Sequence, residues 1–204
     1  MSFNDYFDKV YVINLKKRED RLNLVTNEMC KHRIFFERYD AVDGQLLQTE
    51  LKLRKGVVGC KLSHQNVIRD IAVSNFKTAA VFEDDIILHS DFDVLFPLFY
   101  KELPQDWDFV YLGGNNVRPA VPITTHVHKT TRTFALHGYL IKGHVAAAMA
   151  REFHTWIRQI DVDIDGFLQC NKMKSYIFSP KLAFQREGYS DNLNRNVNYD
   201  KQLL

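Results

Sequence analysis

The sequence has few cysteines, little net charge and no long apolar run. Its three cysteines, Cys30, Cys60 and Cys170, lie far apart and lack the paired spacing of a metal site, so we expect thiols in a reducing compartment. The net charge of +2 is too small to indicate a nucleic acid or a membrane surface as partner. No run reaches the roughly 18 apolar residues of a membrane-spanning helix, so we expect no transmembrane segment. The first residues lack the basic start and apolar core of a secretory signal, which favours a cytoplasmic location.

The composition is that of a globular protein. Apolar residues make up 46% of the 204 residues and aromatic residues 13%, which is enough to build a sizeable core. We find no internal repeat, low-complexity segment or domain linker in the sequence. Residues 1–204 are therefore expected to form a single domain.

A short apolar run ends abruptly at three acidic residues. Residues 79–82 predict a buried strand, and Glu83, Asp84 and Asp85 follow it directly. In an open α/β sheet, ligands bind beyond the carboxyl ends of the strands. Adjacent carboxylates repel one another, so hydrogen-bond donors or an oxygen-liganded cation such as Mg²⁺ or Mn²⁺ must hold them. The alternative interpretation is a solvated acidic turn.

A basic turn follows the first predicted strand. Residues 10–15 predict a buried strand, residues 16–21 are rich in lysine and arginine, and a helix is expected to run to about Lys31. Arginine side chains and helix N-termini attract anions, which makes this turn a candidate site for the phosphate or base of a nucleotide. A solvated first helical turn is the alternative.

Predicted strands and helices follow one another along the rest of the chain. The expected strands are residues 34–39, 133–141 and 175–178 with one more inside 106–114, and the expected helices are residues 60–74, 92–101 and 144–158. Asp43-Gly44 predicts a turn. His64 shares a helix face with apolar residues, which favours a buried core histidine, and Ser63 either contacts a ligand or caps.

A second acidic stretch has the spacing that begins a calcium-binding EF-hand loop. Asp161, Asp163 and Asp165 precede Gly166, but the twelfth position of that loop is Lys172 instead of glutamate. A cation at this position repels Ca²⁺, so we reject a calcium site. The carboxylates are left for acid–base chemistry, with an acidic turn at a helix exit as the alternative.

Short motifs run in order along nearly the whole chain. They are Val12-Ile13-Asn14-Leu15 with Arg18 and Arg21, Ala41-Val42-Asp43-Gly44, Gly59-Cys60-Lys61-Leu62-Ser63-His64, Val81-Phe82-Glu83-Asp84-Asp85, Asp106-Trp107-Asp108 with Tyr111-Leu112-Gly113, His137-Gly138-Tyr139, Ile164-Asp165-Gly166-Phe167-Leu168, and Gln185 with Ser190-Asp191. Together they resemble glycosyltransferase family 25, which holds bacterial lipooligosaccharide galactosyltransferases and collagen galactosyltransferases. The resemblance implies a GT-A fold, one Rossmann-like α/β domain that binds a nucleotide sugar and a divalent metal. The chain differs from the family pattern at Lys61, where many members have a small residue, and at Gly166, where glutamate is frequent.

The resemblance also implies roles for individual residues. Asp85 and Glu83 are expected to bind Mn²⁺ or Mg²⁺, and His137 is a third metal ligand, an acceptor contact or a structural histidine. Asp165 matches the late acidic residue of the family and is expected to be the catalytic base on the acceptor hydroxyl. The expected donor-binding residues are Asn14, Arg18, Arg21, Asp43, Ser63, Glu83 and Asp84.

The alternation of the late acidic stretch supports the choice of Asp165. In an extended segment Asp161, Asp163 and Asp165 point the same way, and the apolar residues that follow place Asp165 nearest the core. Burial there raises the pKa of a carboxylate towards a working pH. Asp161 and Asp163 are expected to be solvated and chemically idle.

The implied reaction moves a hexose from a UDP-sugar to a hydroxyl group with inversion at the anomeric carbon. Galactose is the first choice of sugar and glucose the second, and the acceptor is a glycan or a hydroxylysine-containing chain. Two other classes stay open. One is a metal-dependent phosphohydrolase, which could use the same acidic strand end. Hydrolysis of a nucleotide sugar in the absence of any acceptor would favour this class. The other is a catalytically inactive carbohydrate-binding relic. The complete acidic triplet argues against this class.

Overall fold

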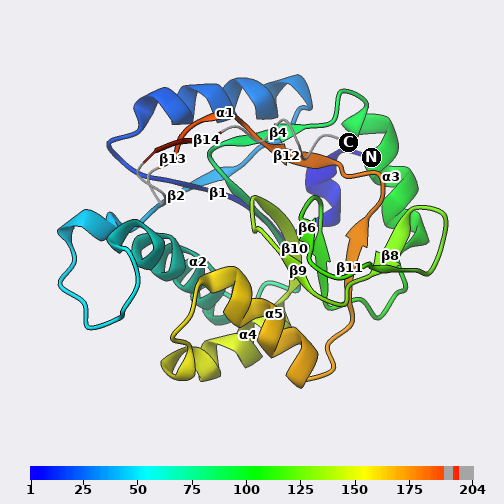
Figure 1. Ribbon diagram of the computed structural model, residues 1–204. Coiled ribbons are helices and arrows are strands. Elements are labelled where there is room, and N and C mark those ends of the chain that lie inside the picture. Colours follow the sequence, from blue (N-terminus) through cyan, green and yellow to red (C-terminus); the bar gives the residue numbers. More distant parts are fainter. Residues whose placement is uncertain (191–194, 198–204) are drawn as a thin grey trace.

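The computed structural model describes residues 1–190 and 195–197, so that the motif residue Asp191 lies outside the described residues. An eight-stranded sheet crosses the described part of the chain (Figure 1). Its strands, in spatial order, are β2 (Glu37–Asp40), β1 (Lys9–Asn14), β3 (Thr78–Glu83), β10 (Gly138–Lys142), β5 (Phe109–Tyr111), β11 (Ser175–Phe178), β8 (Val127–Lys129) and β7 (Val121–Pro122).

The direction of the strands brings polar residues to one edge of the sheet. β1 is parallel to both β2 and β3, with Ile13 opposite Glu83 and Asn14 opposite Asp40. The carboxyl ends of the three strands therefore meet at the same edge, where ligands bind in open α/β sheets. β10 lies antiparallel between β3 and β5, and β11 returns parallel to β5.

Helices cover both faces of this sheet (Figure 1). On one face lie α1 (Glu19–Lys31), α3 (Phe92–Glu102) and the short 3₁₀ helix η1 (Phe3–Tyr6), and on the other lie α2 (Lys55–Val73), α4 (Gly143–Glu152), η3 (Phe153–Thr155) and α5 (Ile160–Cys170). Each face of the sheet packs on its helices to form a hydrophobic core, and successive residues of β1 point into opposite cores. Val12 packs with α1 and α3, and Tyr11 packs with α2. A strand buried on both faces explains why residues 10–15 are continuously apolar or neutral.

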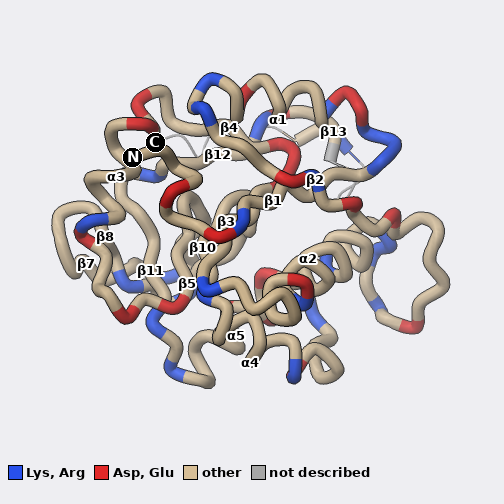
Figure 2. Tube along the Cα trace, turned by 180° about the vertical axis from the view of Figure 1, so that it is seen from behind, with Lys and Arg blue, Asp and Glu red and all other residues tan. Residues whose placement is uncertain are grey.

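Four shorter pieces complete the described structure. The 3₁₀ helix η2 (Gly44–Leu46) follows β2, and β4 (Ile86–Leu88) pairs with β12 (Ala183–Gln185) just beyond the acidic triplet. β6 (Asn115–Asn116) pairs with β9 (Thr133–Phe134), and β13 (Gly188–Ser190) pairs with β14 (Arg195–Val197). Basic and acidic residues are both spread over the described chain, in keeping with the small net charge (Figure 2). Among the described residues, every helix is too short or too polar to cross a membrane.

Most predicted elements are confirmed, with shifted boundaries. The strand predicted at residues 133–141 is divided into β9 and β10, because Ala135 between them has a positive φ of 71° that breaks the run. α2 begins at Lys55 instead of Cys60 and therefore includes Gly59. A Cβ on Gly59 would lie 2.6 Å from the Val42 carbonyl oxygen, so glycine here permits α2 to approach the 42–44 turn.

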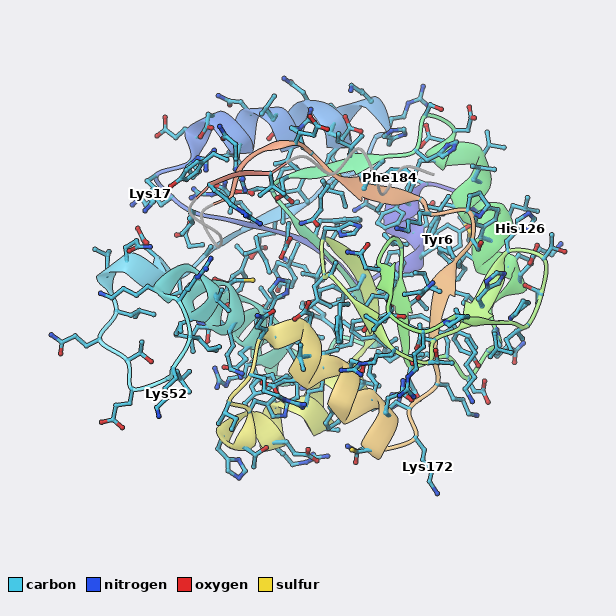
Figure 3. The ribbon with its side chains drawn as sticks, viewed as in Figure 1. Tyr6, Lys17, Lys52, His126, Lys172 and Phe184 are labelled. Carbon is cyan, nitrogen blue, oxygen red and sulfur yellow. The ribbon has the colours of Figure 1, made fainter. Side chains whose placement is uncertain are left out.

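The late acidic stretch is helical, and the extended segment predicted for it is wrong. Ile160, Ile164, Phe167 and Leu168 recur at helical spacing and form one buried stripe of α5, which outweighs the alternation of the aspartates. Asp163 is buried, with 4% of its surface exposed, and the expectation that it is solvated is also wrong. Lys172, which decided against a calcium loop, points away from the protein after the end of α5 (Figure 3).

Candidate functional site

A cavity opens where the carboxyl ends of β1 and β3 meet the N-terminal half of α2. Its volume is about 290 Å³. The walls also include the loop at Ala135 and Leu136, the start of α5, and Gln185. The polar and charged residues that line it are Lys17, Arg21, Asp43, Gln45, Cys60, Ser63, His64, Glu83, Asp84, Asp85, Gln159, Asp161 and Gln185.

Asp84 is held by two partners from the first strand and helix. Its Oδ2 accepts a hydrogen bond from Asn14 Nδ2 at 2.7 Å, and its Oδ1 accepts one from Arg21 Nη1 at 2.7 Å. Burial raises the pKa of Asp84, and the neighbouring Arg21 guanidinium opposes that rise. Asp84 therefore fixes the position of Arg21 at the cavity wall.

Asp85 is the carboxylate with unused acceptor capacity. Its Oδ1 is buried and has no hydrogen-bond partner among the described residues, and its Oδ2 lies 3.6 Å from Arg21 Nη1. Burial, followed by the negative charge of Glu83, raises the pKa of Asp85 to about 7. A carboxylate whose charge the neighbouring Glu83 disfavours, and whose Oδ1 has no partner among the described residues, fits a divalent cation that takes oxygen ligands, such as Mn²⁺ or Mg²⁺.

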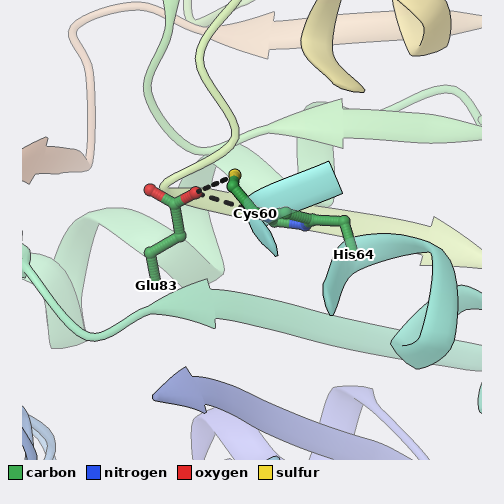
Figure 4. A group of neighbouring side chains, drawn as sticks. All are labelled: Cys60, His64 and Glu83. Atoms are coloured by element: carbon green, nitrogen blue, oxygen red, sulfur yellow. Dashed lines mark hydrogen bonds and ion pairs between the residues drawn. The ribbon is translucent and has the colours of Figure 1, made fainter. Parts of the chain in front are cut away.

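Glu83 faces α2. Its Oε1 lies 3.0 Å from His64 Nε2 and 3.9 Å from Cys60 Sγ (Figure 4). Its Oε2 lies 3.4 Å from Gln185 Nε2. Burial raises the pKa of Glu83, but the hydrogen bond to His64 and the nearby basic groups together outweigh it, so the pKa lies below its usual value. The prediction that His64 is on the packed face is confirmed, since only 1% of it is exposed.

The basic turn contributes two of its cations to the cavity. Arg21 and Lys17 line it, and Lys17 Nζ pairs with Asp43 Oδ2 at 2.5 Å. Arg18 lies outside the lining and pairs with Asp20 at 2.8 Å. Of this turn, Arg21 therefore has the strongest position for an anionic ligand, beside the acidic triplet.

Asn14 and Ser63 support the walls of the cavity through protein contacts. Asn14 is 1% exposed behind Asp84, where its Oδ1 accepts a hydrogen bond from Arg38 Nε at 3.0 Å. Ser63 Oγ accepts from the Val42 amide at 2.9 Å and donates to the Gly59 carbonyl at 2.7 Å. Ser63 thus ties the 42–44 turn to α2 at the cavity wall.

Asp165 and His137 both lie outside the lining residues. Asp165 Oδ1 accepts a hydrogen bond from the Thr133 amide at 3.2 Å, and burial raises the pKa of Asp165. His137 Nε2 lies 3.1 Å from the Ala183 carbonyl oxygen, and burial lowers the pKa of His137. On α5 it is Asp161 that lines the cavity, with its Oδ2 accepting from the Ala135 amide at 3.4 Å.

The structure also brings in residues that the sequence reasoning did not select. Gln185 and Asp161 reach the cavity from segments distant in sequence; each belongs to a stretch noted in the sequence, but the sequence predicts neither of them to bind the donor or the metal. Cys60 did carry a signal, because it lies four residues before His64 and hence on the same face of α2. Its third neighbour, Glu83, comes from a strand, which only the packing of α2 on β3 reveals.

Several proteins of known name are similar to the chain. It is 30% identical over 146 residues to procollagen galactosyltransferase 1-B of Xenopus laevis, covering 57% of this chain and 23% of that protein. It is 26% identical over 162 residues to human procollagen galactosyltransferase 2, covering 66% of this chain and 26% of that protein. It is 28% identical over 160 residues to the human inactive glycosyltransferase 25 family member 3, covering 68% of this chain and 26% of that protein. The chain thus spans about a quarter of the length of these relatives.

Two solved structures are also similar. A mutant Drosophila galactosyltransferase 7, in complex with manganese, UDP-Gal and xylobiose, matches with a TM-score of 0.47 and 9% identity over 96% of this chain and 78% of that one. A glycosyltransferase involved in glycosylation of the major capsid of PBCV-1 matches with a TM-score of 0.41 and 8% identity over 70% and 62%.

The family assignment rests on the match to a family model. The model described as glycosyltransferase family 25 (LPS biosynthesis protein) matches residues 7–168, which is most of the chain. This region runs from the start of the first strand into α5 and holds every lining residue of the cavity except Gln185. The mixed α/β fold predicted from the sequence is present in it. The chain belongs to glycosyltransferase family 25.

Proposed function

We propose that this chain is a metal-dependent, inverting hexosyltransferase domain that transfers a sugar from a UDP-sugar to a hydroxyl group. The observation that carries the proposal is the half-buried carboxylates of Glu83 and Asp85, with one Asp85 oxygen unpartnered among the described residues, beside Arg21 in a cavity of about 290 Å³. Family 25 membership supports the reaction class. Galactose is the first choice of sugar, because several relatives carry that activity in their names, and glucose is the second.

The charged residues that line the cavity indicate where the nucleotide-sugar donor would bind. Asp85 and Glu83 would hold Mn²⁺ or Mg²⁺, which when bound offers Lewis-acid charge to the departing diphosphate. Arg21, kept in place by Asp84, adds a second positive charge at the same wall. Lys17 and Asp43 lie where the basic turn meets the cavity and would contact the nucleotide.

The base that acts on the acceptor is assigned to α5. In an inverting transfer, one carboxylate of the enzyme takes the proton of the acceptor hydroxyl. The oxygen of that hydroxyl attacks the anomeric carbon of the sugar, and the nucleoside diphosphate leaves with the bonding electrons. Asp165 is our candidate from the family motif, and burial raises its pKa as a base requires. Asp161 is the rival, because it lines the cavity and Asp165 does not.

The acceptor is proposed as a hydroxyl of a glycan or of a hydroxylysine-containing chain. The family description names LPS biosynthesis, and several relatives are named procollagen galactosyltransferases, so both acceptor classes have support. The cytoplasmic location stays a prediction. An inactive domain that only binds carbohydrate is the second candidate, because relatives of similar identity are named inactive.

Binding of the donor is the first test. With Mn²⁺ present, UDP-galactose at about 100 times its Kd should raise the melting temperature by roughly 5–10 °C, since a ligand at that level stabilises a domain of this size by about 2.7 kcal/mol. Purine nucleotide sugars with Mn²⁺ serve as the mismatched control. If no UDP-sugar raises the melting temperature, the donor assignment fails.

Measuring the release of UDP distinguishes a transferase from a phosphohydrolase and from an inactive domain. A transferase releases UDP from UDP-galactose mainly when an acceptor is present, whereas a phosphohydrolase cleaves the donor equally well without one. Donor binding with no UDP release in a broad screen of glycan and hydroxylysine acceptors would favour the inactive domain.

A further inference from the structure

Three different metal-binding side chains meet on the wall of the cavity next to α2. The ligand atoms of Cys60, His64 and Glu83, namely a thiol sulfur, an imidazole nitrogen and a carboxylate oxygen, all lie within 4.8 Å of one another (Figure 4). Each of the three residues lines the cavity. A single ion placed among these atoms would therefore be reachable from the cavity.

Regular elements hold the three side chains in place. Cys60 and His64 are four residues apart on α2 and project from the same face of that helix. Glu83 is the last residue of β3, a strand with neighbours on both sides in the sheet. The cluster is thus built on a helix and a central strand, which position ligands more accurately than loops do.

A fourth residue orients the imidazole. His64 Nδ1 lies 3.2 Å from the hydroxyl of Tyr139, a fully buried residue of β10. This contact turns Nε2 towards Glu83 and Cys60. Histidines that bind metals usually use their second ring nitrogen for such a supporting hydrogen bond, which fixes both the tautomer and the direction of the ligand atom.

We propose that Cys60, His64 and Glu83 form a binding site for Zn²⁺, distinct in chemistry from the oxygen-liganded metal site proposed for the donor. Sulfur, nitrogen and oxygen ligands together are typical of Zn²⁺, whereas Mn²⁺ and Mg²⁺ prefer oxygen alone. Three protein ligands leave the fourth tetrahedral position open, as in zinc sites that keep a water or an external ligand. Here the open position faces the cavity.

Glu83 links the two sites. It belongs both to this cluster and to the proposed donor-metal pair with Asp85, so Zn²⁺ bound to Glu83 Oε1 would compete with Mn²⁺ for the same carboxylate. Zinc would then inhibit transfer. This consequence rests on the proposed function, whereas the binding of Zn²⁺ itself does not.

Cobalt provides a direct optical test, because Co²⁺ substitutes for Zn²⁺ and gives a sulfur-to-metal charge-transfer absorption only when a thiolate is a ligand. The purified chain, stripped with a chelator, is titrated with Co²⁺ and then with Zn²⁺. We expect one equivalent of Co²⁺ to produce the near-ultraviolet band and Zn²⁺ to abolish it. Absence of the band in the wild-type chain would overturn the proposal.

Matched cysteine variants locate the ligand. Cys60→Ser should lose the charge-transfer band, while Cys30→Ser and Cys170→Ser, which change exposed thiols elsewhere, should keep it. His64→Gln should weaken Zn²⁺ binding more than about 100-fold and Tyr139→Phe about 10-fold, since loss of a supporting hydrogen bond alone typically costs about 10- to 100-fold. Circular dichroism confirms that each variant is folded. A band that survives in Cys60→Ser, or that disappears in Cys30→Ser, would contradict the assignment.

Asp85→Asn separates this site from the donor site. The variant should keep the cobalt–thiolate band, because Asp85 is not in the cluster, but it should lose Mn²⁺-dependent binding of the UDP-sugar. If Mn²⁺ and UDP-sugars fail to bind the wild-type chain while the cobalt band appears, the proposed function fails and the zinc site stands. The reverse result overturns the zinc site alone.

Discussion

The three acidic residues that follow β3 have different surroundings, although they are adjacent in sequence. Asp84 accepts hydrogen bonds from Arg21 and Asn14, Glu83 lies against His64, and Asp85 keeps an oxygen without a partner among the described residues. Alternation along the chain separates Asp84 from Glu83, as the sequence predicts. At the residue scale, the site thus has one carboxylate used for structure and two available to a cation.

Asp85 is the residue on which metal-dependent donor binding should depend most. Asp85→Asn removes the charge and replaces one carboxylate oxygen with an amide nitrogen that cannot bind a cation, while keeping the shape of the side chain, so we expect loss of the Mn²⁺-dependent part of UDP-sugar affinity with the fold intact. Isothermal calorimetry with and without Mn²⁺ measures this. Asp91→Asn, at a side chain that is 70% exposed away from the cavity, is the control. Unchanged metal-dependent affinity in Asp85→Asn would disprove the assignment.

The base on α5 is tested by a pair of variants. Losing a general base typically lowers the rate by about 10²–10⁴-fold. We expect Asp165→Asn to lower transfer by that order at saturating donor, with little change in donor affinity, and Asp161→Asn to be mild. A large loss in Asp161→Asn instead would show that the position at the cavity wall decides the role. Normal transfer rates in both variants would show that neither Asp161 nor Asp165 is the catalytic base.

At the scale of elements, α2 connects most parts of the site. Gly59 lets it approach the 42–44 turn, Cys60 and His64 face Glu83, and Lys61 on another face reaches α5. Lys61 Nζ contacts Asp163 Oδ2 at 2.5 Å and the Arg158 carbonyl at 2.8 Å, with Lys61 only 2% exposed. This buried ion pair explains the lysine that departs from the usual small residue of the family motif.

Breaking the Lys61–Asp163 pair should cost stability. Asp163→Asn leaves a buried ammonium without its counter-charge, so we expect the free energy of unfolding to fall by about 3–5 kcal/mol, the usual cost of removing one partner of a buried pair. Chemical denaturation measures the change.

A double variant provides the control for that pair. Lys61→Met with Asp163→Leu removes both charges and should recover most of the loss, because apolar replacement of a buried pair is often close to neutral. A loss below about 1 kcal/mol for Asp163→Asn alone would mean that water screens the pair.

At the scale of the whole molecule, the sheet separates two cores and places the cavity at one of its edges. The carboxyl ends of β1 and β3 form one wall, and α2 and α5 form the opposite one. Several charged groups lie there in partly desolvated positions, and burial raises the pKa of Asp85. The cavity should therefore affect how the stability of the whole chain depends on pH.

The metal-free protein should lose stability as pH rises towards neutrality. The pKa of Asp85 is about 7 in the folded chain against 3.8 ordinarily, so the folded state binds this proton more tightly than the unfolded state. Its contribution is complete below about pH 4 and is lost as pH rises through about 7. We expect the melting temperature of the wild type, relative to Asp85→Asn, to fall between about pH 4 and pH 7 and to level off above that range. A constant difference between the two proteins would contradict the raised pKa.

The sequence by itself indicated the central strands β1, β2, β3, β5, β10 and β11, the helices α1 to α4 and the place of the acidic triplet, because periodicity and apolar runs report local burial. It also carried the family motifs and the prediction that His64 is buried. The tertiary structure decided which of these residues meet. Asp163 pairs with Lys61 across 102 positions of sequence and Gln185 reaches Glu83 across 102 positions, contacts that depend on strand order and helix packing. It also made α5 a helix, since its apolar stripe packs against the core, and so placed Asp161 in the cavity lining and Asp165 outside it.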